Sequence, residues 1–488
     1  MRKSAASDLV EQLKSKPIDM TVKEIPLQNG KAYICYIAQL VDRNALSQFV
    51  VTPMVEYVQK GGSMTPAQAA ERILYADECK LGSNLNEVEF NILNGQTVIL
   101  FSSDAQFVVV NCKQVQHRDV AAPELMYSAR GPRDSFVETL DINLSLLRYR
   151  LKDGSISIDK KEVGKRTRST VAIVYLTDVA NPAVVKEISK RLDSINTDGI
   201  YESGELQGYL LNKKSALFPQ LGMIERSDMA VEKLLEGKVI ILIDGSGIAL
   251  FAPVVFTELL YSCDDRYENK YFGMFMRIIR YLAMILSITL SSFYVSLAEF
   301  HPDALPANYI VTFAQMRARA PFSAFIAALS IEFIIELMRE ALLRVPVKIG
   351  SAIAIVGAII IGQAAISSGI YTPLLLILTS ISFLATFAIP DLTLANPLRI
   401  LKFLVIILTG FFGLYGFSLA FTVVLTLVVS VDSFGVPYTA PWAPYNGYDA
   451  KRAFMFSRRG SPLRQQYMHT QDDTRSPGAK KYKNDSKK

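Results

Sequence analysis

The sequence contains few of the residues that build metal sites and disulfide-bonded scaffolds. It has four cysteines and three histidines in 488 residues, all widely spaced, and no C-x-x-C pair. A metal site needs several such ligands at short spacing, so we expect neither a metal nor another cofactor. We interpret the four cysteines as reduced packing residues: Cys35, Cys79, Cys112 and Cys263.

Signals for secretion and for catalysis are also missing. The first thirty residues contain no apolar run long enough for a signal peptide, so we expect the N-terminal half in the cytoplasm. No serine lies in a G-x-S-x-G elbow, and no Cys/His pairing is indicated. The glycine-rich run 244–247 precedes another apolar run and no helix, which favours a hairpin turn over a phosphate loop. We therefore predict that the protein is not an enzyme.

The basic residues concentrate at the C-terminal end. Residues 451–488 carry eleven lysines and arginines against three aspartates, and the rest of the chain is slightly acidic. No stretch combines basic residues with stacking aromatics, so nucleic-acid binding is not expected. We predict that residues 436–488 form a basic disordered tail that binds anionic lipid if it faces the cytoplasm.

Hydrophobic residues make up half of the chain and gather after position 270. Residues 349–390 and 403–431 are uncharged runs of 42 and 29 residues, and a membrane-spanning helix needs roughly 20. The longer run divides near the Ser/Gly/Pro turn at 367–373, and further apolar segments cover 276–298 and 321–344. These segments predict a transmembrane domain over residues 271–435 with four or five spans. Cytoplasmic N- and C-termini would require an even number of crossings.

Two segments of this region contain candidates for an ion pathway. Glu332, Glu336 and Glu340 recur every four residues and share one helix face, where lipid contact is excluded. They either line a cation pathway or are neutralised by Arg339 and Arg344. The next helix carries an apolar face that either forms a dewetting gate at a symmetry axis or contacts lipid; its members are Ile353, Val356 and Ile360.

The N-terminal half indicates a duplicated α/β fold. A strand–helix unit beginning near residue 32 resembles one beginning near 171, and the hairpin-like run 95–110 resembles 237–252. Nearly equal offsets in matching order argue for two copies of one fold. We predict an N-terminal arm (1–30), a first α/β subdomain (31–115), a connecting helical segment (116–168) and a second α/β subdomain (169–270), followed by the helical transmembrane bundle.

The connecting segment contains the most distinctive run, RGPRDSFVETLDINLSLLRYR at 130–150. Arg130 and Arg133 flank a Gly-Pro turn, and Asp134 is positioned to cap a helix with apolar residues at helical spacing. We predict that this element joins the two copies, or adjacent subunits, through Arg130, Arg133 and Asp134.

This run is similar to the hallmark sequence of the A subunits of spore germinant receptors, the GerA family. Other similar stretches are LLEGKVIILIDGSGIALFAP at 234–253, LTGFFGLYGF at 408–417 and SFGVPYTAPWAP at 433–444. The similarity extends over about residues 32–445. The sporulation protein SpoVAF resembles the same subunits and is an alternative within the family.

The resemblance implies a multi-pass protein of the inner membrane of the bacterial spore. It implies a transporter-like B subunit and a lipoprotein C subunit as partners, a pentamer-like homo-oligomer, and release of monovalent cations that starts germination. Two functional hypotheses follow: an oligomeric ligand-gated ion channel, and a non-conducting scaffold that recruits germination proteins.

Overall fold

The computed structural model folds into two compact units. The α/β unit comprises residues 1–211, 221–253 and 460–488, and the helical unit comprises residues 212–220 and 254–459. The structure describes residues 5–16, 19–76, 78–113, 131–132, 134–211, 217–304, 306–318, 320–345, 362–455, 463–472 and 474.

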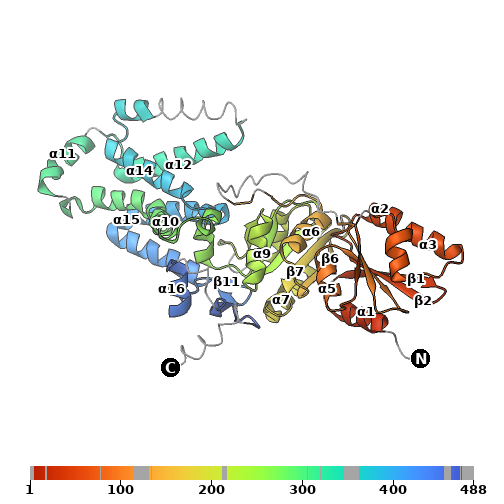
Figure 1. Ribbon diagram of the computed structural model, residues 1–488. Helices are drawn as coiled ribbons and strands as arrows, with labels where there is room; N and C mark the ends of the chain where they lie inside the picture. Colours follow the sequence, from red (N-terminus) through yellow and green to blue (C-terminus); the bar gives the residue numbers. More distant parts are fainter. Residues whose placement is uncertain are drawn as a thin grey trace, which may run out of the picture. The chain divides into compact units, whose positions relative to one another are not determined.

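Two five-stranded antiparallel sheets of the same topology build the α/β unit (Figure 1). The first has the order β1 (Met20–Leu27), β2 (Gly30–Ile37), β4 (Thr97–Phe101), β5 (Phe107–Val110), β3 (Cys79–Gly82). The second has the order β6 (Ile156–Val163), β7 (Ser169–Leu176), β9 (Val239–Ile243), β10 (Ala249–Ala252), β8 (Gly222–Ile224). Because strand order and antiparallel pairing repeat, the predicted duplication is confirmed.

Helices cover both faces of the first sheet, because its central strands are apolar on both sides. The adjacent residues Ile34 and Cys35 of β2 belong to separate cores. Ile34 shares its core with Met54, whereas Cys35 shares its core with Val10 and Val88. Figure 1 accordingly shows α3 on one side of the sheet and α1 on the other. The helices of this unit are α1 (Ala5–Ser15), α2 (Arg43–Leu46), α3 (Thr52–Gln59), α4 (Pro66–Gln68), α5 (Glu87–Leu93), α6 (Leu140–Arg150), α7 (Pro182–Asp193), α8 (Ser203–Leu210) and α9 (Ser227–Leu235).

The two copies share one glycine–phenylalanine pair at the same place in the sheet. Gly82 on edge strand β3 lies opposite Phe107 on β5, and Gly222 on edge strand β8 lies opposite Phe251 on β10. In both pairs the phenylalanine ring lies over the glycine, where a Cβ atom would overlap it. Each ring therefore fills the space that an edge side chain would otherwise occupy.

Two predicted boundaries are wrong because both copies begin earlier than expected. Helix α1 and strand β1 belong to the first copy, so residues 5–27 are not a separate arm. Strand β6 is the first strand of the second copy and not part of the connecting segment. Both β1 and β6 are edge strands with charged, exposed residues, a pattern that suits an edge but lacks the apolar run expected of a central strand.

The prediction of a disordered tail from residue 436 onward is also wrong for the residues that the structure describes. Residues 447–455 form helix α16 (Gly447–Met455), and residues 463–472 pack on the α/β unit with Met468 fully buried. A few apolar side chains at suitable positions are enough to dock this segment, although its average composition is polar and basic. Residues 475–488 lie outside the described residues.

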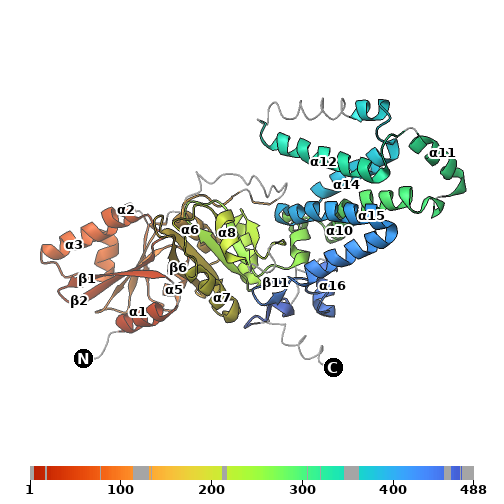
Figure 2. The same ribbon diagram turned by 180° about the vertical axis from the view of Figure 1, so that it is seen from behind.

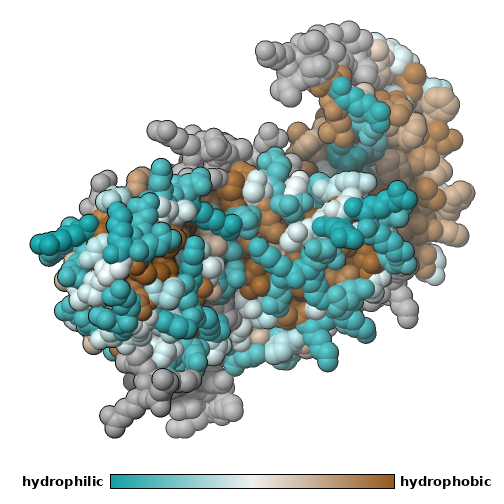
Figure 3. Space-filling view, turned by 90° about the vertical axis from the view of Figure 1, so that its right-hand side faces the viewer, coloured by the Kyte–Doolittle hydropathy of each residue, from teal (hydrophilic) through white to brown (hydrophobic). Residues whose placement is uncertain are grey.

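The helical unit has an apolar outer surface. Helices α10 (Lys270–Glu299) and α15 (Leu392–Val429) are long and apolar enough to cross a membrane, and α14 (Pro373–Phe387) is a shorter apolar helix. The visible surface of this unit is mostly hydrophobic in Figure 3, whereas the visible α/β surface is largely hydrophilic. This unit also contains α11 (Ala307–Ala318) and α12 (Ala324–Leu343). A helical C-terminal region is thus confirmed, and the number of four or five spans stays a prediction.

Polar contacts give the directions of these helices. The Ser291 hydroxyl of α10 bonds Glu332 of α12, and the Glu299 carboxylate accepts from the amide of Phe325, so α12 runs antiparallel to α10. Helix α14 also runs antiparallel to α10, because its two ends meet α10 in reverse order: Thr372 with Tyr294, and Ser382 with Ser287. Helices α12 and α14 therefore run in the same direction.

Helix α15 reverses its direction at Gly413. This glycine has φ 58° and ψ −137°, which no helical residue adopts, and it lies against Phe300 just after the end of α10. The first half (392–412) runs parallel to α10. The second half (414–429) runs antiparallel to α10, and the ring centres of Phe417 and Phe293 are 6.2 Å apart. At 1.5 Å per residue the halves are about 31 and 24 Å long, so each alone approaches the thickness of a bilayer core. The uncharged run 403–431 is therefore not one span.

The segments before α10 and after α15 meet at one end of the helical unit. The Ser433 hydroxyl accepts from the Val254 amide at 2.9 Å, and the Tyr438 carbonyl accepts from the Phe256 amide at 2.7 Å. These contacts join the segment before α10 to the segment after α15. The number of membrane crossings between the two segments stays a prediction.

Placing a methyl group under the Phe251 ring tests the packing of the second copy. In Gly222→Ala, the new methyl group should displace Phe251 and destabilise the protein by about 1–3 kcal/mol. Gly208→Ala on α8 is the matched control, because its Cβ would meet no atom within 4 Å, and it should leave stability unchanged or raise it. Thermal unfolding of the detergent-solubilised protein, followed by circular dichroism, measures both. Equal melting temperatures for the two variants would contradict this account of the pair.

Candidate functional sites

The motif element of the α/β unit is held by a three-way contact at Asp134. Its carboxylate accepts two hydrogen bonds from Nη2 of Arg150, at 2.5 and 2.6 Å, and one from the Ser227 hydroxyl at 2.7 Å. Asp134 does not cap α6 as predicted. The helix begins later, at Leu140, whose amide donates to Asp244 on the β9–β10 turn at 3.0 Å. Sequence spacing could not find this cap, because Asp244 is remote in the chain.

The partners of Asp134 shift its pKa. Burial acts to raise the pKa, but the hydrogen bonds from Arg150 and Ser227 and the positive charge of Arg150 outweigh burial and lower it. The carboxylate is therefore the stable form at neutral pH, and the contact fastens the start of the motif to the end of α6 and to α9.

Helix α6 contacts both copies, so it joins them as predicted, and the role proposed for the two arginines stays a prediction. The apolar residues at helical spacing are buried: Phe136, Leu140, Leu144 and Leu147. Towards the first copy, Asp141 and Ser145 line an open hollow of about 360 Å³ with Asp42 and Asn44, and Lys113 lies 5.0 Å above the Tyr149 ring. Arg130 and Arg133 lie outside the described residues.

Removing the charge of Asp134 tests this contact. Asp134→Asn should lower stability at pH 7 by about 1–2 kcal/mol, because Arg150 loses its ionised partner. A carboxyl with a lowered folded-state pKa stabilises the fold above its unfolded pKa of about 4, and this contribution disappears as the pH falls through the folded value. The difference between wild type and variant should therefore shrink below pH 4.

The control is Asp141→Asn, whose exposed carboxylate lies 3.4 Å from Lys160, and which should change stability by less than about 0.5 kcal/mol. Urea unfolding curves between pH 3 and 7 measure these differences. If Asp134→Asn lowers the free energy of unfolding as much at pH 3 as at pH 7, the ionic contact is not the cause of the loss.

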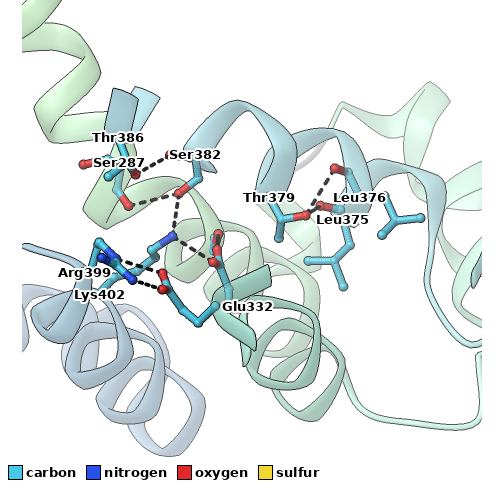
Figure 4. A network of polar contacts seen from close by, with 11 residues as sticks. Ser287, Glu332, Leu375, Leu376, Thr379, Ser382, Thr386, Arg399 and Lys402 are labelled. Carbon is cyan, nitrogen blue, oxygen red and sulfur yellow. Dashed lines mark hydrogen bonds and ion pairs between the residues drawn. The ribbon is translucent and has the colours of Figure 1, made fainter. Parts of the chain in front are cut away.

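The helical unit contains a buried polar cluster where four helices meet (Figure 4). Lys402 of α15 donates to Glu332 of α12 at 2.7 Å, and both side chains are almost fully buried, at 2% and 0% exposure. Ser291 of α10 donates to the same carboxylate at 2.5 Å. Ser382 of α14 accepts from Lys402 at 3.4 Å and donates to the Ser287 carbonyl at 3.0 Å. Every helix of the cluster thus contributes a partner to the ion pair.

The other two acidic residues of α12 are paired as well. Glu336 binds Arg399 of α15 through both carboxylate oxygens, and Glu340 binds Arg344 at 2.7 Å on the exposed side of the helix. All three glutamates are therefore neutralised in this structure. Glu340 has its predicted partner Arg344, whereas Glu332 and Glu336 bind Lys402 and Arg399 instead of the predicted arginines. Arg339 instead lies over the rings of Phe383 and Phe387, 5.0 and 5.1 Å from their centres.

Two arginines near the start of α10 are paired with neighbouring segments of the protein. Arg280 on α10 forms two hydrogen bonds to Asp265, at 2.6 and 2.8 Å. Arg277 donates to the Ala453 carbonyl of α16 and stacks on Tyr261, with its guanidinium 3.9 Å from the ring centre. The first turns of α10 are thereby fixed to the segments around them.

The gate candidates Ile353, Val356 and Ile360 lie outside the described residues. Among the residues that the structure describes, no three His, Cys, Asp or Glu side chains gather as a metal site. The sites found here are therefore ionic contacts between elements.

Comparison with known proteins places the chain in a family. The model of the Bacillus/Clostridium GerA spore germination proteins matches residues 8–465. The chain belongs to the GerA family. It is 32% identical to the spore germination protein GerLA of Bacillus cereus over 95% of both chains, and 34% identical to the spore germination protein B1 of Bacillus subtilis (strain 168) over 86% of this chain and 87% of that one. The resemblance to the GerA family that the sequence motifs indicated is thus confirmed.

One solved structure is also similar to part of this GerA-family chain. It is the crystal structure of the N-terminal domain of the A subunit of the Bacillus megaterium spore germinant receptor GerK3. The match has 23% identity and a TM-score of 0.39, and covers 51% of this chain and 93% of that one.

Sequence reasoning missed Lys402 and Arg399 as partners of the acidic residues. Lys402 and Arg399 lie 70 and 63 residues after the glutamates they bind, at the start of the last apolar run, where the sequence indicates only the boundary of a span. One signal was available, because Lys402 and Arg399 are three residues apart and thus share a helix face, as Glu332 and Glu336 do. Matching two oppositely charged faces would have paired α12 with α15.

Breaking the buried ion pair between Glu332 and Lys402 tests how much it stabilises the helical unit. Lys402→Met should destabilise the helical unit by about 3–5 kcal/mol, because Glu332 is left charged and buried. The double variant Glu332→Gln with Lys402→Met should recover most of this loss, since no unpaired charge remains. Arg344→Ala is the control: it breaks an exposed pair on α12 and should cost less than about 0.5 kcal/mol. Unfolding in mixed detergent micelles measures all three, and a double variant no more stable than Lys402→Met would contradict the prediction.

Proposed function

We propose that this GerA-family protein is the A subunit of a nutrient germinant receptor in the inner membrane of the spore. In this proposal it spans the membrane several times and acts with a transporter-like B subunit and a lipoprotein C subunit. Several copies form a ligand-gated channel that releases monovalent cations at the start of germination. The family match over residues 8–465 is the observation that carries the proposal, and the apolar surface of the helical unit supports a membrane location.

The interior of the helical unit favours a pathway between copies over one within a single copy. The centre of the bundle contains the buried pair Glu332–Lys402, and the neighbouring pair Glu336–Arg399 adds a second link between α12 and α15. Water and ions passing through the middle of one copy would have to separate these charges. A homo-oligomer, pentamer-like as the family resemblance implies, places the pathway at a shared axis instead.

The gate in this proposal is the apolar face of Ile353, Val356 and Ile360. Rings of such side chains around an axis would close the pathway by dewetting. Glu332 and Glu336 are less suited to attract cations, because each already binds a basic residue of the same chain. Glu340 is the acidic residue of this face whose side chain is exposed.

Cation flux from liposomes that contain the purified chain alone tests the channel. Val356→Ala should widen the ring and release K⁺ without nutrient, whereas wild type and Val356→Phe should stay closed. Val429→Ala on α15 is a matched control, because it removes the same two methyl groups from a side chain that is 55% exposed. If Val356→Ala releases no more K⁺ than Val429→Ala, the gate assignment fails and the non-conducting scaffold becomes the better hypothesis.

A further inference from the structure

The hairpin between the first two strands differs between the two α/β copies. In the first copy two residues join β1 to β2, since Leu27 pairs with Gly30. In the second copy the five residues 164–168 (GKRTR) join β6 to β7, since Val163 pairs with Ser169. Both sheets have the same topology, so the fold needs only the shorter turn. The sheet alone therefore does not explain the longer loop, which we call the basic loop.

The basic loop is fastened to the segment before α8 through its backbone. The Lys165 amide donates to the Thr197 carbonyl at 2.9 Å. The Asp198 carbonyl accepts from the amides of Arg166 and Thr167, at 2.8 and 3.3 Å. Because these backbone groups are bonded inward, the loop is held in place while the side chains of Lys165 and Arg166 are exposed.

Arg168 adopts a backbone conformation that favours glycine. Its φ of 47° lies in the left-handed region, which is unfavourable for a residue with a Cβ atom. Its amide closes the loop by donating to the Gly164 carbonyl at 3.2 Å. A glycine at position 168 would close the loop with less strain, so the strain points to a use for the exposed arginine side chain.

The cations of the basic loop lack counter-charges. Within the part of the chain that the structure describes, Lys165, Arg166 and Arg168 form no ion pair. The neighbouring lysines of β6 differ, because Lys160 lies 3.4 Å from Asp141 and Lys161 lies 2.6 Å from Asp193. Three unpaired positive charges within four residues attract an anionic group.

Two exposed tyrosines lie beside the basic loop. Tyr201 is 72% exposed, and its hydroxyl lies against Gly199, which also contacts Thr167 of the loop. Tyr209 is 44% exposed and belongs to α8, which is labelled in Figure 2. Its hydroxyl donates to the Thr197 hydroxyl at 3.2 Å. Tyrosine and arginine are enriched among the residues that contribute most to protein–protein binding.

We propose that the basic loop, Tyr201 and Tyr209 form a docking surface for an acidic segment of a partner protein. Carboxylates of the segment bind Lys165, Arg166 and Arg168, and the tyrosine rings supply apolar contact beside them. The planar guanidinium groups of the two arginines suit carboxylates, which they bind through two parallel hydrogen bonds.

The composition of this surface favours a protein segment over a lipid surface. Basic clusters that bind anionic lipid contain about four to eight lysines and arginines, whereas the basic loop contains three. Exposed tyrosines beside the charges are typical of protein interfaces. Charge complementarity with a short acidic segment therefore describes the surface best, and lipid binding is an outcome of the test.

Photocrosslinking from position 201 tests the surface on the full-length protein in detergent. With p-benzoylphenylalanine in place of Tyr201, light should join the protein to a biotinylated hexaglutamate peptide and not to hexalysine. Arg166→Glu with Arg168→Glu should lower the yield at least about tenfold, because like charges then face each other. Lys60→Glu with Lys80→Glu is the matched control, which makes the same charge change at exposed lysines of the first copy and should keep the yield within about twofold of wild type. Equal yields in the two double variants overturn the surface.

Arg168→Gly separates binding from stability. Glycine relieves the left-handed strain, so the melting temperature should stay at that of wild type or rise, while the crosslinking yield falls. An unchanged yield overturns the role of the arginine in binding. A lower melting temperature overturns it as well, because the side chain would then serve to hold the loop.

The nature of the partner is tested in spores that carry the same photoreactive residue at position 201. Sequencing of the crosslinked peptide should show a protein segment with more aspartate and glutamate than lysine and arginine. Its recovery should be lost in Arg166→Glu with Arg168→Glu and kept in the control pair. Crosslinks to lipid, crosslinks to a segment without an acidic excess, or no crosslink at all overturn the proposal.

Discussion

The ion pair between Glu332 and Lys402 is the contact on which the helical unit depends. Two opposite charges are buried among apolar helices, and each would be costly without the other. Both can be satisfied only if α12 and α15 lie side by side, with Ser291 of α10 and Ser382 of α14 completing the hydrogen bonds. The pair thus specifies which helices are neighbours, a task that uniform apolar surfaces perform poorly in lipid.

The α/β unit contains two copies of the same sheet, which other elements hold together. The copies do not share strands. Helix α6 lies between them: its start is capped by Asp244 of the second copy, and its Asp141 and Ser145 line a hollow with Asp42 of the first. The loop after the second strand of each sheet accepts a different segment of the chain. Asp42 of the first copy donates to Cys112, whereas Val179 of the second copy accepts from Gln471.

The helical unit is stabilised by further contacts of this kind. Its rigid parts are fixed by buried ionic contacts, such as Arg280 with Asp265 at the start of α10. The direction of the chain changes at Gly413, which allows α15 to return to the end where α10 began.

The sequence by itself determined the family, the duplication and the helical C-terminal region, because each depends on local order: a motif, a repeated offset, or the length of an uncharged run. It indicated that the glutamates of α12 share a face, since helical spacing alone dictates that. It did not identify their partners, the cap of α6, the reversal of α15 or the packing of residues 463–472 on the α/β unit. Asp244, Lys402 and Met468 are remote in sequence from the groups they contact, and a pairing between distant residues is decided by packing. Even the edge strands β1 and β6 required the sheet, because a charged, exposed strand is recognisable only from the neighbour to which it is hydrogen-bonded.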